Sequence, residues 1–319
     1  TIVPARTALA VPDECLRWFT PERWQRFVAD VSWFRSDSPR DYWYRMQQDH
    51  GFNAPPTWAV AGALATTFTD ASATTQARLA LLDPLLLTAM FTLVGWAFGW
   101  RVLWVALVVW GCQMPSNGGW TAGALLRQDW LCALVASVCL LKRNRPLAGG
   151  VAFATAAALR IFPALLLAVP LVVAARALWR RTRVPPAYCR FGAGLVLGGV
   201  VWFGVASGMH GPAAWGEFRA HMARHTSAPL ANQVGLPALL SQTIAGRLAL
   251  TEDPTAVDRY RAWREGRQAT FAARWPLYGV LLAFVAVLTV IAGARVRPLW
   301  CALPASALVV IAGLDLASY

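Results

Sequence analysis

Three features of the sequence predict an all-α, polytopic membrane protein. Of the 319 residues, 57% are hydrophobic and 14% are charged, which is more apolar surface than one soluble core of this size can bury. Apolar stretches approaching the roughly 20 residues that cross a bilayer recur from residue 79 onward. Short arginine-rich breaks separate these stretches, as in loops on the cytoplasmic side of a membrane.

Eight candidate spans divide the apolar part of the chain, and several of them are short. They cover residues 79–100, 102–113, 120–141, 146–159, 161–178, 190–206, 276–293 and 298–313. The basic breaks are Arg101, residues 142–145, residues 180–183 with Arg190, and residues 295–297. If every basic break faces the cytoplasm, the spans alternate consistently. The segments that then share the outer face are residues 1–78, 115–119 and 207–275, and the turn between 159 and 161 lies on the same side.

This topology predicts four regions. Residues 1–78 form an outer-face loop with juxtamembrane helices, including the short apolar run 55–68, and residues 207–275 form a second outer loop. Membrane helices occupy residues 79–206 and 276–319. Because the chain starts at Thr1 with no apolar segment before the first loop, we expect a fragment that lacks its first span. A positive charge supplied almost entirely by arginine indicates a bacterial cytoplasmic membrane.

Several function classes are excluded by the sequence. The net charge of +13 does not indicate nucleic-acid binding, because the arginines lie between apolar runs and not on a soluble basic domain. His221 and His225 share a helix face but lack the glutamate of a zinc-binding HExxH motif, so no metal site is expected. The sequence has no glycine-rich nucleotide loop and no nucleophile elbow, so no cofactor is expected.

Two charged sites on the predicted outer face are candidates for chemistry. Asp13 and Glu14 precede an aromatic, amphipathic stretch, where a partly buried carboxylate can act as a general base. A helix N-terminus is the alternative interpretation, since acidic residues favour the first turn. Arg160 interrupts two apolar runs, where it either binds a phosphate or extends to the headgroups without function.

Charged residues also lie within a predicted span. Arg127 and Asp129 fall in the run 120–141, where ionisable residues indicate function by default. The alternative is an ion pair of Arg127 with Asp129 or Asp83 that only stabilises packing. Further binding candidates in the outer loops are Asp49, His210 and His225.

Five short motifs extend over most of the chain from residue 13 to about residue 240. They are Pro12-Asp13-Glu14, Phe52-Asn53-Ala54-Pro55-Pro56, Arg127-Gln128-Asp129-Trp130, Leu159-Arg160-Ile161-Phe162-Pro163 and Asn232-Gln233. In this order they resemble motifs of the GT-C glycosyltransferases, in particular the family 87 branch that uses polyprenol-phosphate-mannose. The sequence departs from that branch by Arg127 for glycine, Arg160 for lysine and Val234 for serine. Arginine at position 160 keeps the charge and adds a fork suited to phosphate.

The resemblance implies a GT-C-like bundle of membrane helices with large outer loops. It implies a hexosyltransferase that moves a hexose, with mannose favoured, from a polyprenyl-phosphate donor to a hydroxyl of a lipid or glycan acceptor at the outer face, with inversion. Asp13 is then the catalytic base, Glu14 assists it, and Arg160 binds the leaving phosphate. With the loop candidates, the expected substrate-binding residues are Arg160, Gln128, Asp129, Arg127, Asn232, Gln233, Asp49, His210 and His225.

Other interpretations stay open at this level. A polysaccharide polymerase or ligase also uses lipid-linked substrates on the outer face. A secondary transporter would explain charges inside the spans and a helix break at Arg160, but the two halves of the chain show no inverted repeat. Loop tryptophans either stack on sugar rings or form an interfacial belt; they include Trp18, Trp24, Trp33, Trp43 and Trp58.

Overall fold

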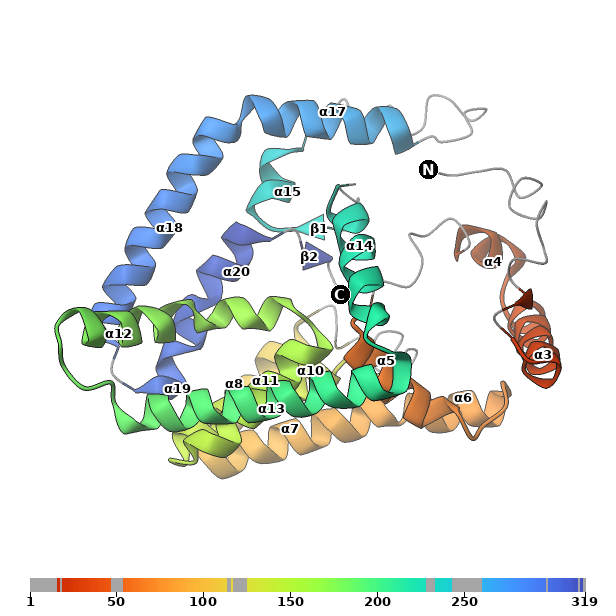
Figure 1. Ribbon diagram of the computed structural model, residues 1–319, viewed down its shortest axis with the longest axis horizontal. Helices are drawn as coiled ribbons and strands as arrows, with labels where there is room; N and C mark the ends of the chain where they lie inside the picture. The colour runs from red at the N-terminus through yellow and green to blue at the C-terminus, as the bar shows by residue number, and fades with distance from the viewer. Residues whose placement is uncertain are drawn as a thin grey trace.

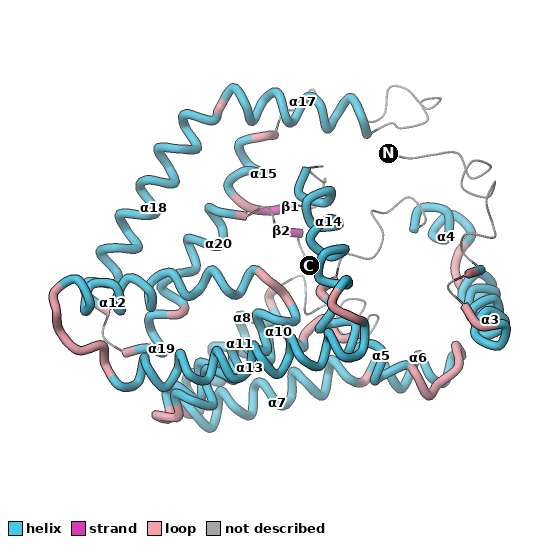
Figure 2. Tube along the Cα trace, in the orientation of Figure 1, coloured by secondary structure: helices cyan, strands magenta, loops and turns pink. Residues whose placement is uncertain are grey.

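The computed structural model describes most of the chain as helix (Figure 1). The described residues are 16, 17, 19–46, 54–113, 116, 125–227, 233–242, 260–296, 298–314 and 316–317. Among them, the only strands are β1 (Gln233–Val234) and β2 (Leu316–Ala317), which form one short antiparallel pair, drawn in magenta in Figure 2. The predicted all-α class is confirmed in the described part of the chain.

Five helices form a row in which each packs against the next. In spatial order they are α8 (Trp100–Gly111), α7 (Leu82–Phe98), α10 (Asp129–Lys142), α11 (Pro146–Leu159) and α13 (Pro186–His210). Gly99, with φ of 84°, ends α7 and turns the chain into α8. Proline at the first position of α11 and of α13 starts each helix without loss of a hydrogen bond.

A second group of helices packs beside this row. It contains η2 (Phe162–Leu167), α12 (Ala168–Trp179), α18 (Trp275–Arg295), α19 (Leu299–Ala302), η3 (Pro304–Ser306) and α20 (Ala307–Gly313). A shared core joins the two groups, in which Phe153 of α11 and Val169 of α12 are fully buried with Leu303. The Ser306 hydroxyl accepts the backbone N–H of Val169 at 2.9 Å, so α12 is fixed to the C-terminal helices.

Helices α11 and α13 approach each other through glycine. A methyl group added at Gly194 would lie 2.1 Å from the carbonyl oxygen of Leu147, and one added at Gly150 would lie 2.2 Å from that of Phe191. Small residues that allow backbones to approach this closely are typical of helix pairs in membranes. The packing of α11 on α13 therefore depends on these two glycines.

Replacement of Gly194 by leucine is expected to destabilise the fold by about 3 kcal/mol or more, because the new side chain collides with backbone atoms that cannot move aside. Gly199, on the same helix, has no atom within 4 Å of an added methyl group, so Gly199→Leu is the matched control. Thermal unfolding in detergent measures both variants. Equal melting temperatures for the two variants would contradict this interpretation of the packing.

Four helical segments are long and apolar enough to cross a membrane: Ala73–Phe98, Phe162–Trp179, Pro186–His210 and Trp275–Arg295. Each of the eight predicted spans overlaps one or more helices, but the other helices are too short by length and composition. Helix α8 has 12 residues and α11 has 14. The prediction of eight spans is thus reduced to four among the described residues, because predicted runs such as 102–113 and 146–159 were already too short to cross a bilayer.

The long helices expose apolar side chains over much of their length. In α18, only 11% of the most apolar window is buried, and Val280 and Phe284 are 66% and 59% exposed. Val196 and Val200 on α13 are 67% and 65% exposed. Apolar surface of this extent is unfavourable in water and is the surface expected of a protein surrounded by lipid.

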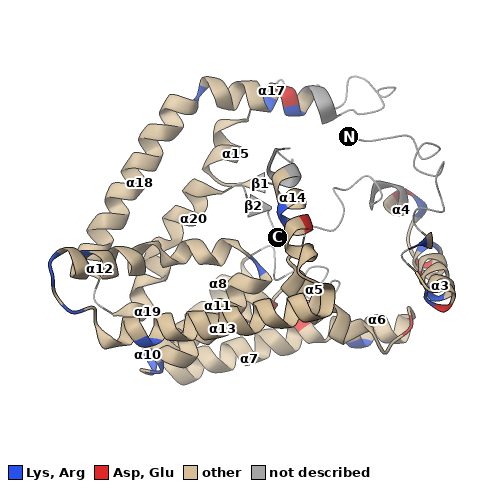
Figure 3. Cartoon of the chain, viewed as in Figure 1, with Lys and Arg blue, Asp and Glu red and all other residues tan. Residues whose placement is uncertain are grey.

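Charge is distributed unequally between the two ends of the helix row (Figure 3). Lysine and arginine gather at the turn between α10 and α11 and at the loop between α12 and α13. Acidic residues appear on α3 (Pro21–Asp37), in the connection before α6 (Ala73–Ala80), on α14 (Ala213–Ser227) and on α17 (Tyr260–Ala273), away from those turns. The predicted alternation requires the basic breaks to share one end, and these two do; the side of the membrane they face stays a prediction.

Both predicted outer loops contain helices. The first holds α3, α4 (Arg40–Met46), α5 (Pro56–Thr66), which matches the predicted run 55–68, and α6. The second holds α14, β1, α15 (Leu236–Leu240) and α17. The buried guanidinium of Arg267 on α17 donates to the hydroxyl of Ser241, at 2.6 and 3.0 Å, and to the carbonyl of Ala238, so α17 is fixed to the end of α15.

Candidate functional site

A cluster of buried polar groups lies where α5, α7, α10 and the break after α11 meet. Asp83, in the first turn of α7, is fully buried. Its two carboxylate oxygens accept the backbone N–H groups of Arg127 at 3.0 Å and Gln128 at 2.8 Å. Two such bonds satisfy a buried carboxylate and fix the segment that enters α10. Asp83 thus has a structural role through the backbone of residues 127 and 128.

Asp129 is the first residue of α10 and is 9% exposed. Its Oδ1 accepts the N–H of Trp130 at 2.6 Å, while its buried Oδ2 has no hydrogen-bond partner among the described residues. The charge of Arg160 attracts this carboxylate and that of Asp83 repels it. A buried polar oxygen left unbonded is rare enough to indicate a functional position.

Arg160 lies where α11 ends and the chain becomes extended, with φ of −144° and ψ of 127°. Pro163, three residues later, prevents continuation of the α-helical hydrogen bonds, so the chain resumes as η2. The guanidinium lies 6.0 Å from the ring centroid of Trp58 on α5. Trp58 donates its indole N–H to the carbonyl of Leu126 at 3.3 Å, so one side chain links Arg160 to the segment before Asp129.

Two further contacts hold the elements of this cluster together. The hydroxyl of Thr57, a fully buried residue, donates to the carbonyl of Ala158 in the last turn of α11. Trp130 and Phe162 pack edge to face with ring centroids 4.7 Å apart. The start of α5, the start of α10 and the Arg160 break are therefore positioned by direct contacts.

Of the predicted substrate-binding residues, the structure brings Arg127, Gln128, Asp129 and Arg160 to one place. From the sequence, Asp83 was expected only as an ion-pair partner of Arg127. Trp58 was expected only as one of the tryptophans of the outer loop. The residues that lie outside the described part of the chain are Asp13, Glu14, Asp49 and Asn232.

The remaining predicted residues lie elsewhere. Gln233 is in β1, paired with Ala317, and His225 is in α14; the structure describes the side chain of neither. His210 ends α13 and lines a cavity of about 350 Å³ with Glu217 and His221 of α14. Within the described ranges, no group of three His, Cys, Asp or Glu side chains could hold a metal ion.

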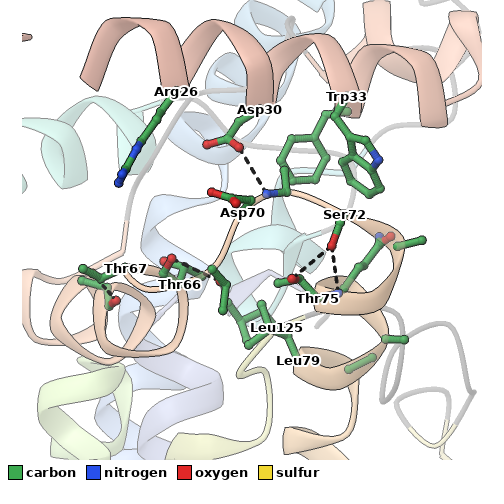
Figure 4. Close-up of a pocket in the computed structure, with 18 of the residues that line it drawn as sticks. Arg26, Asp30, Trp33, Thr66, Thr67, Asp70, Ser72, Thr75, Leu79 and Leu125 are labelled. Atoms are coloured by element: carbon green, nitrogen blue, oxygen red, sulfur yellow. Dashed lines mark hydrogen bonds between the residues drawn. The ribbon is translucent and has the colours of Figure 1, made fainter. Parts of the chain in front are cut away.

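A cavity of about 820 Å³ lies between α3 and the connection from α5 to α6 (Figure 4). Helix α3 contributes Arg26, Asp30 and Trp33 to one wall, and the carboxylate of Asp30 accepts the N–H of Ala71 at 3.2 Å. The opposite wall carries a series of hydroxyl groups, and the floor is apolar. The hydroxyls and floor residues labelled in Figure 4 are Thr66, Thr67, Ser72, Thr75, Leu79 and Leu125.

The cavity adjoins the polar cluster. Leu125 precedes the segment that Asp83 holds, and Leu79 lies one helical turn before Asp83 along the combined helix α6–α7. Its volume is in the range of sites for small organic ligands. An indole ring, carboxylates and many hydroxyls are groups that bind a polyhydroxylated ligand by stacking and hydrogen bonding. Sequence reasoning missed this cavity, although the hydroxyl-rich stretch 66–75 between two helices was a visible signal.

Comparison with protein-family models, with curated proteins and with solved structures gives no match to this chain. The class of protein is therefore defined by the fold and the site alone. It is a helical protein with four helices able to cross a membrane and a buried polar cluster beside a cavity.

Proposed function

We propose that the protein is a polytopic membrane glycosyltransferase, with a GT-C-like arrangement of helices. It transfers a hexose, with mannose favoured, from a polyprenyl-phosphate donor to an acceptor hydroxyl at the non-cytoplasmic face, with inversion. The observation that carries the proposal is the convergence of Arg160, Trp58 and the segment 127–129 at a helix break. This cluster adjoins the cavity between α3 and the connection before α6, away from the basic turns.

Arg160 binds the donor phosphate in this proposal. When the glycosidic bond breaks, negative charge grows on the leaving phosphate, and a positive group held nearby stabilises that charge. The extended backbone at residue 160 frees the guanidinium from a helix face, and Trp58 supports it from one side. A planar guanidinium can bind two phosphate oxygens at once.

The acceptor binds in the 820 Å³ cavity, with its hydroxyls toward the threonine and serine side chains. Its attacking oxygen forms a bond to the anomeric carbon while the bond from that carbon to the phosphate oxygen breaks. The proton of the acceptor hydroxyl passes to Asp13, which Glu14 assists. Asp13 precedes α3 by eight residues in the sequence, and α3 forms a wall of the cavity.

Membranes that contain the protein, supplied with labelled polyprenyl-phosphate mannose, test this function. We expect label to move from the lipid phosphate into a product that resists the mild acid that cleaves the donor. Nucleotide-linked mannose in place of the lipid donor should give no product when polyprenyl-phosphate is absent. Failure of every polyprenyl-phosphate hexose to donate would refute the proposal.

Trp33 is expected to bind the acceptor by stacking. Its replacement by alanine should raise the acceptor KM about 10-fold, because one aromatic contact contributes about 0.5–1.5 kcal/mol beyond its buried area. Trp24→Ala is the matched control, since Trp24 is on the same helix but does not line the cavity. Steady-state kinetics with the acceptor varied separate the two variants. An equal KM for both would place the acceptor elsewhere.

A secondary transporter is the second candidate, because Arg160 at a broken helix and the buried Asp83 and Asp129 could also form a translocation pathway. A transporter would move labelled substrate into vesicles without changing it chemically. A polymerase or ligase would instead produce chains of increasing length, or transfer whole glycans. The chemical form and size of the labelled product therefore distinguish the three functions.

A further inference from the structure

Two arginines of the turn between α10 and α11 share one indole ring. The guanidinium carbons of Arg143 and Arg145 lie 4.9 and 5.7 Å from the ring centroid of Trp96, near the end of α7. Arg143 also donates to the carbonyl oxygen of Trp96. Both arginines are exposed, and Trp96 is 39% exposed, so the guanidinium edges can still reach a ligand.

A third cation lies beside them in the same turn. The ammonium nitrogen of Lys142 is 4.3 Å from the ring centroid of Trp300 and 5.7 Å from that of Phe98. These two rings pack edge to face, and they come from α19 and from the end of α7. Helices distant in sequence thus meet around one turn. We call it the basic–aromatic turn, made of Lys142, Arg143 and Arg145 with Trp96, Phe98 and Trp300.

The backbone of this turn is fixed by hydrogen bonds. The N–H of Arg145 donates to the carbonyl of Leu140 at 2.8 Å, and that of Arg143 donates to the carbonyl of Cys139 at 3.0 Å. Asn144 has φ of 56°, a left-handed conformation that asparagine tolerates better than most residues. The three cationic residues therefore project from a turn of fixed backbone conformation.

The chain segments that form this turn contain no carboxylate to compensate its charge. Residues 84–128, 130–216 and 266–314 contain no aspartate and no glutamate. The basic–aromatic turn, its aromatic partners and the nearby loop 180–183 all fall in these ranges. Since like charges that share one ring repel, an anion bound between them would be strongly favoured. Because the chain segments around the turn carry no acidic side chain, this anion must be a separate molecule.

We propose that the basic–aromatic turn binds the phosphate of an anionic phospholipid headgroup at the membrane surface. The guanidinium edges of Arg143 and Arg145 bind the phosphate oxygens, and the tryptophans lie at the headgroup level, where indole rings are favoured. Basic side chains beside membrane helices bind such lipids through the same attraction. This site depends on membrane insertion and not on glycosyl transfer, since it lies at the end of the helix row away from the 820 Å³ cavity.

Native mass spectrometry of the full chain in neutral detergent, titrated with phosphatidylglycerol or phosphatidylcholine, tests the site. We expect wild-type protein to retain phosphatidylglycerol and not phosphatidylcholine. The double variant Arg143→Gln/Arg145→Gln should bind phosphatidylglycerol about 30-fold more weakly, because each basic residue near the surface contributes about 5-fold to the affinity. The matched control Arg180→Gln/Arg183→Gln removes two exposed arginines from the loop between α12 and α13 and should bind as wild type.

Equal weakening in both double variants would show that diffuse charge, and not this turn, attracts the lipid, and would overturn the proposal. Displacement of the lipid by an equal concentration of inorganic phosphate would also overturn it, since the site would then take a free anion. Trp96→Leu keeps every charge and is the second variant, in case the double substitution prevents folding. It should also weaken binding, and unchanged binding in Trp96→Leu would refute a role for the shared ring.

Discussion

Replacement of Asp13 by asparagine is expected to lower the rate of hexose transfer by about 10²–10⁴-fold, the usual contribution of a general base. Asparagine preserves the size and polarity of the side chain but cannot take the proton of the acceptor hydroxyl. The acceptor KM should change little, because the loss affects the transition state more than the bound substrate. Transfer kinetics in membranes, with donor and acceptor varied in turn, measure the effect.

Variants of Glu14 and of a distant carboxylate complete this experiment. Glu14→Gln should lower the rate less than Asp13→Asn if Glu14 only assists, and two adjacent carboxylates should give a pH profile that belongs to the pair. Asp37→Asn is the matched control, since Asp37 ends α3 and does not line the cavity. If Asp13→Asn and Glu14→Gln both transfer hexose at the wild-type rate, the proposed base is wrong.

Replacement of Arg160 by glutamine should lower kcat by about 10²–10³-fold, the effect of removing one group that stabilises developing negative charge. Arg160→Lys keeps the positive charge and should recover part of the rate, without the two-pronged contact to phosphate. Arg180→Gln, a change at an exposed arginine of the basic loop, should leave kcat unchanged. Donors whose lipid phosphates differ in leaving ability test directly whether Arg160 stabilises the leaving phosphate. The rate of Arg160→Gln should depend more strongly on the leaving group than the rate of the wild type does.

Loss of folding is the competing explanation for an inactive Arg160→Gln protein. Removal of Arg160 takes away the positive charge that attracts the buried Asp129 carboxylate, so the variant should be less stable. The double variant Arg160→Gln/Asp129→Asn removes both charges and should recover most of the melting temperature. It should stay inactive if Arg160 binds phosphate. Recovery of transfer in the double variant would show that Arg160 only balances Asp129.

The apolar pattern located the helices well but overestimated how many could cross a membrane. Hydropathy located the apolar runs, but several of the runs predicted as spans, such as 102–113 and 146–159, are shorter than a membrane crossing requires. The structure has breaks close to those that the sequence predicted, since Gly99 ends α7 before α8 and Arg160 separates α11 from η2. Helix α10 begins only at Asp129, because Asp83 holds the two preceding backbone N–H groups outside the helix. That contact joins residues more than 40 positions apart, which no local pattern reveals.

The candidate site was likewise predicted only in part from the sequence. Sequence motifs identified Arg160 and residues 127–129 separately, and the structure places them around Trp58. The 820 Å³ cavity escaped prediction because its walls come from α3 and from the α5–α6 connection, which lie far apart until the chain folds. The short pairing of β1 with β2 was also missed, since two residues per strand carry no periodicity.

The sequence by itself determined that this protein is helical and apolar, and that arginine-rich breaks separate its apolar runs. Composition, apolar run length and the absence of carboxylates over long stretches are properties of the chain alone, and they do not depend on how the chain folds. Only the tertiary structure decided which charged groups meet. A buried carboxylate such as Asp83 requires donors, and the fold supplies them from a distant segment whose position depends on how α7 and α10 pack.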